Sequence, residues 1–400
     1  MPLSPEFYRG NRQKIQKRLQ PGEVFVHGAH RRLQKSADET FFSQDRDFLY
    51  LSGIDEPDWI LVITTDREFL IAPQLTRVER LFDGGLSFEE ATALSGGAQV
   101  FDNKPGWHEL DALLKSATEV QLVLREDRLW FRTHANPSLS TLLRRVRART
   151  TSPVVSVHPQ IHAARAIKQP EEIAAIEKAI EITGQALEDV RQKFQNYQAE
   201  YEIAADLTAG FMRRQSRGHA FTPIVASGQN ANTVHYIANN QLLTKDATVI
   251  IDVGAEWRGY GADISRTLIW GEASARAKDV HAAVRTAQER IIKALKPGLT
   301  FKEYYQQEMT ICADEMARIG LFTEKTTENV RRFYPYGGHM LGLDIHDVSS
   351  GKKAFEPGMV LTVEPGIHLH DEGIGVRIED DILITEDGSR NLSKHISHDL

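Results

Sequence analysis

The sequence has almost no cysteine and no long apolar run, and each absence excludes a class of protein. Its 400 residues include one cysteine, Cys312, so no internal disulfide can form and a metal site has to use oxygen and imidazole ligands. No run of eighteen apolar residues occurs, and the first ten residues carry prolines and charges where a signal peptide has an apolar segment. We expect a cytoplasmic protein without a membrane segment.

An excess of positive charge is also lacking. The 48 Lys and Arg residues are outnumbered by 55 Asp and Glu residues, which gives a formal net charge of -7. A protein that follows nucleic-acid phosphates usually carries clustered basic residues. The one basic run, at residues 144–149, is typical of a solvated helix face, so we expect no nucleic-acid partner.

The length predicts two domains, because 400 residues exceed what one hydrophobic core usually organises. The first third mixes short patterns of both kinds: strands are predicted at residues 24–26, 48–51 and 59–63, and helices at residues 13–19 and 88–94. This mixture indicates an α/β domain over residues 1–164.

The pattern changes before a long amphipathic helix. Gln169-Pro170-Glu171-Glu172 is typical of a helix start, with proline in the first turn followed by acids. Beyond it, helices alternate with strand pairs of β-branched character. We therefore expect an α+β domain over residues 165–400.

One strand pair of this second domain carries acids where apolar side chains are expected. Asp252 lies inside an apolar strand at residues 248–254 and Asp263 inside the answering one at residues 260–267, and an acid inside such a strand needs a reason. Their midpoint lies at Trp257-Arg258, so a symmetric hairpin turning there would place the two aspartates directly opposite each other. Gly259 leaves open a bulge that shifts this register.

Glu364 and Glu379 repeat the construction around a midpoint at Asp371-Glu372, beside Gly373. Facing β-carbons lie roughly 5 Å apart, which suits carboxylates that bridge two metal ions about 3.5 to 4 Å apart. Four acids at one buried point would repel each other and take up protons unless cations were present. Two divalent ions would balance the four charges.

A histidine completes the candidate ligand set. His339 lies in a glycine-rich segment, and His346-Asp347 follows seven residues later. Taken singly, each acid is more typical of a solvent-facing or ion-paired residue, and His339 of a structural histidine. The two matched hairpins favour a metal site. An oxygen-rich set with one imidazole suits Mn²⁺ first, with Co²⁺ or Zn²⁺ as alternatives.

In this order the residues resemble the ligands of the pita-bread metallopeptidases, which include methionine aminopeptidase, aminopeptidase P and prolidase. The implied ligands are Asp252, Asp263, His339, Glu364 and Glu379. The surrounding segments look like the proline-peptidase branch, whereas the methionine branch lacks the His346-Asp347 extension and the large front domain. The resemblance implies an α/β N-terminal domain followed by an α+β pita-bread catalytic domain.

The front domain resembles the N-terminal domain of aminopeptidase P, through residues 36–38, 44–53 and 56–57. The linker at residues 165–173 looks like the family's connection into the catalytic domain, so the likeness covers nearly the whole chain. A scaffold role fits most of the front domain. By resemblance we also expect a homodimer or homotetramer in which the front domain shapes the neighbour's site.

The resemblance further implies metal-dependent hydrolysis of the peptide bond preceding proline. A hydroxide bridging two metal ions would attack the carbonyl, and Glu364 would take its proton and pass it toward the leaving nitrogen. His235 matches a histidine near the scissile bond, and His346 one that would steady the oxyanion or the prolyl residue. Arg377, two residues before Glu379 on one strand face, would orient the acids.

Three positions depart from the family's pattern. His368 stands where a tyrosine usually helps to relay the proton; it either replaces that tyrosine, which we favour, or has no role. Pro335 stands where a histidine is usual, in a segment that looks one residue short. Phe221 replaces a tyrosine, which removes a hydroxyl near the metals. The five ligands stay in place, but their surroundings change.

The pattern leaves three functions open. A Xaa-Pro aminopeptidase is favoured by the front domain and by the short separation of Glu364 and Glu379, where prolidases often carry a longer insertion with a carboxylate-binding arginine. A prolidase confined to Xaa-Pro dipeptides is the alternative. Some pita-bread relatives have lost their ligands and become binding proteins; because all five ligands are present here, we expect an enzyme.

Overall fold

The computed structural model describes residues 2–34, 36, 40–124, 137–334, 337–349, 351 and 353–400. The chain divides into two compact units, Met1–Ile161 and His162–Leu400. The boundary expected between residues 164 and 165 lies inside helix α7 (His158–Ala166) and stays a prediction. Within the described residues, no helix has both the length and the apolar character that a membrane crossing requires.

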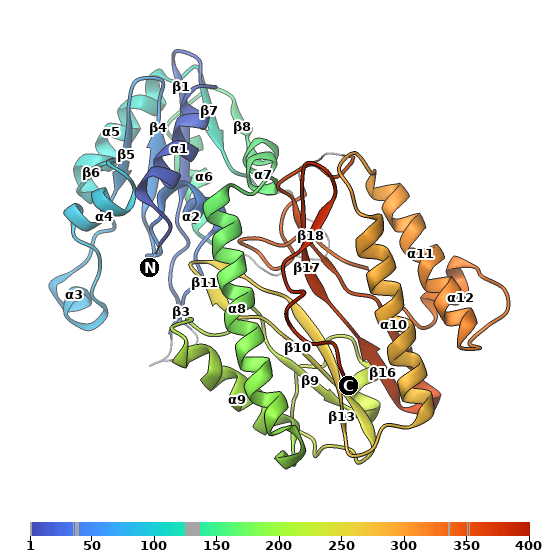
Figure 1. The fold of residues 1–400 in the computed structure, drawn as a ribbon. Helices are drawn as coiled ribbons and strands as arrows, with labels where there is room; N and C mark the ends of the chain where they lie inside the picture. The colour runs from blue at the N-terminus through green and yellow to red at the C-terminus, as the bar shows by residue number, and fades with distance from the viewer. Residues whose placement is uncertain are drawn as a thin grey trace. The chain divides into compact units, whose positions relative to one another are not determined.

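The first unit is built on a six-stranded mixed sheet (Figure 1). Strand β1 pairs antiparallel with β4 and parallel with β7, at the centre of the order β6-β5-β4-β1-β7-β8. The strands are β1 (Glu23–Gly28), β4 (Ile60–Ile63), β5 (Glu68–Ile71), β6 (Gln99–Phe101), β7 (Glu119–Leu122) and β8 (Val154–Ser156), with β2 (Leu33–Gln34) and β3 (Thr40–Phe41) paired separately. Its helices are α1 (Pro5–Gln16), α2 (Arg46–Ser52), α3 (Arg77–Asp83), α4 (Phe88–Leu94), α5 (Asn103–Ser116) and α6 (Ser138–Arg147).

Residues 48–51, predicted as a strand, belong instead to helix α2. Asp45 begins this helix by accepting a hydrogen bond from the backbone N–H of Phe48 at 2.9 Å, and Gly53 ends it at a φ of 71°. The N-cap and the left-handed C-cap therefore outweigh the strand propensity of the apolar run between them. The helix predicted at residues 88–94 is confirmed as α4.

The second unit places two helix pairs against two β-hairpins (Figure 1). Helix α8 packs on α9 and contacts strands of the first hairpin, and α10 packs on α11 and contacts strands of the second. The helices are α8 (Pro170–Gln192), α9 (Glu200–Arg213), α10 (Ala275–Ala294), α11 (Phe301–Arg318) and α12 (Thr327–Arg331), with the 3₁₀ turns η2 (Phe194–Asn196), η3 (Gly228–Asn232) and η4 (His370–Glu372). The helix start predicted at Pro170 is confirmed.

The strands of the second unit form short antiparallel sheets. The first set is β9 (Ile224–Ser227), β10 (Ala247–Val253), β11 (Glu256–Trp257), β12 (Tyr260–Gly261) and β13 (Ile264–Trp270). The second set is β14 (Val360–Val363), β15 (Gly366–Leu369), β16 (Ile374–Arg377), β17 (Asp380–Ile384) and β18 (Ser389–Asn391). Apolar side chains of this second set pack with α10 and α11 into one buried core.

The register of the first hairpin differs from the symmetric prediction. Strand β10 pairs with β13 so that Asp252 lies opposite Ser265, and Asp263 is a diagonal neighbour. The turn is centred on Arg258 and Gly259, which both have positive φ (57° and 89°), one position later than expected. Two consecutive left-handed residues match the twist of a tight hairpin, so the turn chemistry decided the register. Asp252 and Asp263 still share one face of the hairpin. Asp263 lies two residues from Ser265, the direct partner of Asp252, and side chains two residues apart on a strand point to the same side.

The second hairpin has the predicted register. Gly366 lies opposite Arg377 in β15 and β16, and Val363 lies opposite Asp380 in β14 and β17. Both pairings follow one symmetric register, in which Glu364 and Glu379 face each other between the two short ladders.

A glycine permits the close backbone approach beside the two aspartates. A Cβ atom on Gly254 would lie 1.6 Å from the carbonyl oxygen of Ala262. Neither atom belongs to a movable side chain, so any larger residue has to separate the strands that carry Asp252 and Asp263.

We expect Gly254→Ala to destabilise the second unit by roughly 2 to 4 kcal/mol, because the added methyl group collides with backbone. Gly388→Ala is the matched control, since a Cβ there meets nothing within 4 Å, and it should change stability by less than about 0.5 kcal/mol. Thermal unfolding of both variants measures this. Equal melting temperatures would show that the approach is not tight in solution.

Candidate metal centre

Three ligand atoms from distant parts of the second unit converge. One side-chain atom each of Asp263, His339 and Glu379 lies within 4.8 Å of the others. The Nε2 atom of His339 is 3.4 Å from Oδ2 of Asp263 and 3.7 Å from Oε1 of Glu364. The two hairpins and the glycine-rich segment before His339 therefore bring four of the five predicted ligands to one point.

Asp252 joins this cluster through Arg377. The guanidinium donates from Nη2 to Oδ2 of Asp252 at 2.6 Å and from Nε to Oγ of Ser265 at 2.8 Å. That hydroxyl donates in turn to Oε2 of Glu379 at 2.9 Å. Arg377 thus contacts Asp252 directly and reaches Glu379 through Ser265, while its predicted role in orienting the acids stays a prediction.

Burial and neighbouring charges raise the pKa values of three of the carboxylates. Burial raises the pKa of Asp263 well above its ordinary value, and nearby carboxylates, Asp252 first, add to the rise. Burial followed by the charges of its neighbours does the same to Glu379. Burial raises the pKa of Glu364 to about 7, although His339 and Arg377 oppose the rise. The single positive charge of Arg377, which contacts Asp252, cannot balance four carboxylates at neutral pH.

The donor set fits divalent cations. Four carboxylates and one imidazole are hard-to-borderline ligands of the kind that Mn²⁺, Co²⁺ and Zn²⁺ accept. Among the described residues, no hydrogen-bond donor reaches the buried Oδ1 atom of Asp252. A buried anionic oxygen without a donor is costly unless a cation binds it. The residues present therefore suit a metal centre.

A second imidazole lies against the candidate ligand His339. The rings of His339 and His346 are stacked, with centroids 3.9 Å apart and planes inclined by 20°. Partial burial and the imidazoles of His339 and His235 lower the pKa of His346 to about 4. His346 is therefore a neutral imidazole beside the cluster, with an exposed edge.

His235 lies on the exposed loop that follows η3. Arg377 donates from Nη1 to the carbonyl oxygen of the preceding residue, Val234, at 3.3 Å. The following residue, Tyr236, donates its hydroxyl to Oε2 of the buried Glu200 at 2.8 Å. Hydrogen bonds thus hold both neighbours of His235, and Arg377, which binds the carbonyl of Val234, also binds Asp252.

His368 is buried in β15. Its Nδ1 atom lies 2.9 Å from the carbonyl oxygen of Ala231, which can only accept, so Nδ1 carries the proton. Burial, followed by the charge of Arg377, lowers the pKa of His368 to about 4. The side chain is a neutral imidazole fixed against η3.

Of the other two departures from the family pattern, Phe221 and Pro335, the structure describes the first. Phe221 is half-buried, and its Cε1 atom would lie 3.2 Å from a Cβ on Gly254, so the ring borders the first hairpin. Pro335 lies outside the described residues.

Sequence reasoning missed several polar residues around the cluster. Asp381 is fully buried and accepts the backbone N–H of Asp263 on Oδ2 at 3.2 Å. Thr362 donates its hydroxyl to Oε1 of Glu364 at 3.2 Å. Asp381 lies two residues after Glu379, so in an extended strand the two side chains point to the same face, and the acidic run 379–381 could have indicated this. No comparable local pattern marks Glu200 or Thr362.

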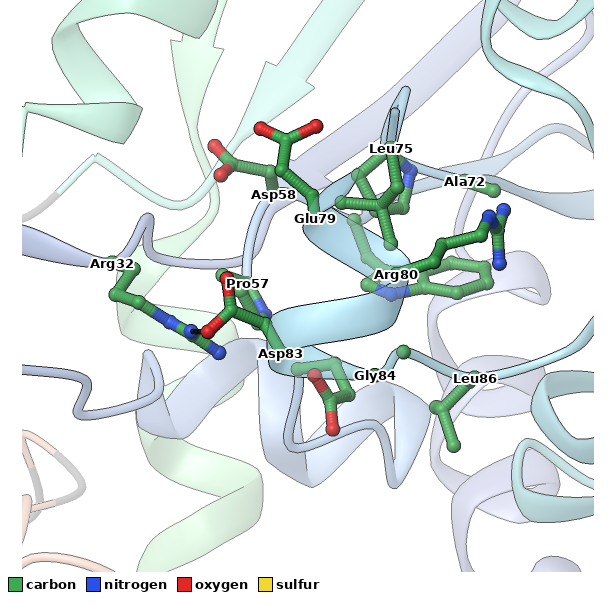
Figure 2. Close-up of a pocket in the computed structure, with 14 residues that line it drawn as sticks. Arg32, Pro57, Asp58, Ala72, Leu75, Glu79, Arg80, Asp83, Gly84 and Leu86 are labelled. Carbon is green, nitrogen blue, oxygen red and sulfur yellow. Dashed lines mark ion pairs between the residues drawn. The ribbon is translucent and has the colours of Figure 1, made fainter. Parts of the chain in front are cut away.

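The first unit holds a pocket that contains none of the predicted site residues (Figure 2). An ion pair between Arg32 and Asp83, 2.7 Å long, lies in its wall. The pocket is lined by Arg32, Glu56, Pro57, Asp58, Trp59, Ala72, Pro73, Leu75, Glu79, Arg80, Asp83, Gly84, Gly85 and Leu86.

Known proteins share this architecture along the whole chain. The Xaa-Pro aminopeptidase of Escherichia coli strain K12 is 29% identical over 422 residues, which cover 98% of this chain and 96% of the relative. A solved structure of a candidate aminopeptidase P from Bacillus anthracis has a TM-score of 0.89 at 30% identity, over 99% of this chain and 96% of that one. Aminopeptidase P from E. coli, solved with the inhibitor Pro-Leu, has a TM-score of 0.87 at 28% identity, over 100% and 97%.

Family profiles match both units. The profile of the aminopeptidase P N-terminal domain matches residues 8–123. The profile of metallopeptidase family M24 matches residues 174–386, more than half of the chain. The predicted α/β domain followed by a pita-bread catalytic domain is confirmed. The chain belongs to metallopeptidase family M24, in its aminopeptidase P branch.

Proposed function

We propose that this chain is a Xaa-Pro aminopeptidase, which removes the N-terminal residue from peptides that have proline second. The observation that carries the proposal is the convergence of three buried carboxylates on one imidazole, with Asp252 joined to them through Arg377. The chain also matches a Xaa-Pro aminopeptidase over nearly the full length of both proteins. Such a cluster is suited to metal-assisted hydrolysis.

Asp252, Asp263, His339, Glu364 and Glu379 are the residues that would hold two divalent ions. Their oxygen-rich chemistry favours Mn²⁺, with Co²⁺ or Zn²⁺ as alternatives. The ions would supply a nucleophile at neutral pH and polarise the scissile carbonyl. The four carboxylates support this assignment, because their negative charges would balance those of two divalent ions.

Glu364 is the residue that would accept a proton on its carboxylate and pass it to the leaving nitrogen. Thr362 orients its Oε1 atom, and burial holds its pKa at about 7 in the absence of metal. A carboxylate can act first as a general base and then as a general acid, as both steps require.

Two histidines and Arg377 complete the proposed machinery. His346, neutral and exposed beside His339, would donate its N–H to the developing oxyanion or contact the prolyl residue. His235 would contact the scissile bond from its loop. Arg377 would hold Asp252 and the His235 loop in one arrangement.

An aminopeptidase is favoured over a dipeptidase. Glu364 and Glu379 are joined by β15, the short turn η4 and β16, without an inserted segment. The E. coli aminopeptidase P was solved with Pro-Leu as inhibitor, a dipeptide that begins with proline. A product of this kind arises from a substrate longer than a Xaa-Pro dipeptide.

We also propose a homo-oligomer, a dimer or tetramer, in the cytoplasm. Helix α3 of the first unit exposes 62% of Val78, 81% of Leu81 and 80% of Phe82, an apolar surface of the kind that association covers. Light scattering of the purified protein tests this assembly.

The substrate assignment predicts the outcome of a peptide panel with defined metals. Ala-Pro-Ala should be cleaved to Ala and Pro-Ala, with kcat/KM roughly tenfold or more above that for Ala-Pro, and Ala-Ala-Ala should resist cleavage. Glu364→Gln, which keeps the shape of the side chain, should lose roughly 10²-fold or more of the activity. Cleavage of Ala-Pro alone would identify a prolidase instead.

Metal removal should change stability in a pH-dependent way. The folded-state pKa values of Asp263, Glu364 and Glu379 lie above their unfolded values, so the metal-free protein loses stability as pH rises from about 4 through neutrality. Divalent ions bind the deprotonated carboxylates, so the rise in melting temperature on adding Mn²⁺ should grow from pH 5 to pH 8.

Calorimetry with EDTA or Mn²⁺ at each pH measures this difference. Asp263→Asn is the control: it should shrink the Mn²⁺ effect and raise the stability of the metal-free protein at pH 8. A Mn²⁺ effect that is constant across pH would contradict the proposed cluster.

Two variants separate the possible roles of His368. His368→Asn can still donate to the carbonyl of Ala231 but lacks a basic nitrogen, whereas His368→Phe lacks both. If His368 relays the proton, both variants should lose roughly 10²-fold in kcat with unchanged metal affinity. An active Asn variant beside an inactive Phe variant would show that the side chain only holds η3.

A further inference from the structure

We propose that Arg165 and Lys168 are positioning residues for His346: they hold the carboxylate of Asp347 from two sides and so fix the loop that stacks His346 on His339. The inference rests on the proposed function, in which His346 contacts the substrate. It also assigns a role to the linker residues 165–168, which include none of the five proposed metal ligands.

The clamp consists of three charged side chains that are each 1% exposed. Arg165 Nη2 lies 2.7 Å from Oδ1 of Asp347, and Lys168 Nζ lies 2.8 Å from Oδ2. Burial alone would raise the pKa of Asp347, but the charges of Lys168 and Arg165 lower it below its ordinary value. The carboxylate is therefore ionised, and moving it would take a buried partner away from both Lys168 and Arg165, although Arg165 also pairs with Asp344 at 2.8 Å.

The loop between the two histidines has little freedom around this clamp. The backbone N–H of Asp347 donates to the carbonyl of Met340 at 2.8 Å, which closes the loop on itself. A Cβ on Gly342 would lie 2.1 Å from Oδ2 of Asp347 and 2.9 Å from Cε of Lys168. Glycine is therefore needed where the loop passes the clamp.

His339 has anchors of its own. Its backbone N–H donates to Oγ1 of Thr362 at 3.1 Å, and its carbonyl accepts the N–H of Thr362 at 2.8 Å. His346 is joined directly to Asp347, so the clamp sets its position more than that of His339. Loss of the clamp should displace His346 and leave the proposed ligand in place.

The test is Lys168→Met in the full-length protein, with Lys168→Gln as a milder variant that keeps a neutral donor. We expect kcat to fall about tenfold or more in the Met variant, while KM and the dissociation constant for Mn²⁺ stay within about threefold. Nuclear magnetic resonance of the metal-free protein should show that the ring-current shift of the His346 imidazole protons is lost in the Met variant and reduced in the Gln variant.

A double-mutant cycle separates positioning from general destabilisation. If Lys168 acts through His346, the cost of Lys168→Met in kcat should disappear in a His346→Ala background. Ile176→Ala, a fully buried truncation in α8, is the control for lost stability and should keep the ring-current shift.

Either of two results would overturn the clamp: an unchanged ring-current shift in Lys168→Met, or an equal cost of this substitution with and without His346. A wild-type protein that cleaves no Xaa-Pro peptide would refute the proposed function instead, and the resonance measurement would still decide whether the clamp places His346.

Discussion

The repulsion among buried carboxylates is the constraint on which the second unit depends. Asp252, Asp263, Glu364 and Glu379 lie together in the interior, where burial and neighbouring carboxylates raise the pKa values of Asp263, Glu364 and Glu379, and Arg377 contacts Asp252 directly. Such a cluster costs folding energy unless cations bind it. The fold accepts this cost at a cluster whose donor set suits divalent cations, in a chain that belongs to a metallopeptidase family, so stability and the proposed function depend on the same residues.

Around the cluster, the supporting polar residues are buried and connected. Arg377 joins Asp252, Ser265 and the carbonyl of Val234, so an acid of the first hairpin and the loop of His235 share one guanidinium. Glu200 holds the same loop through Tyr236. The loop of His235, a residue proposed to contact the substrate, is thus held by buried polar side chains, as precise sites generally require.

The sequence pattern predicts the register of the second hairpin but not that of the first, and the reason is physical. Glu364 and Glu379 face each other as predicted, because their turn is symmetric about the expected midpoint. The first hairpin turns at Arg258 and Gly259, and the positive φ of both residues moved the register by one position. The apolar run at residues 48–51 predicts a strand although it belongs to helix α2. The residues that cap this helix, Asp45 and Gly53, lie outside the run.

The sequence by itself determined the order of the five candidate ligands, the two-domain architecture and the family, since these depend on residue types and spacing along the chain. Only the tertiary structure decided what surrounds the ligands. Asp381 and Glu200, and the clamp of Arg165 and Lys168 on Asp347, act across long sequence separations, where no local pattern records a contact. The residue types of the centre can be recognised from local sequence, whereas its geometry depends on how distant segments pack.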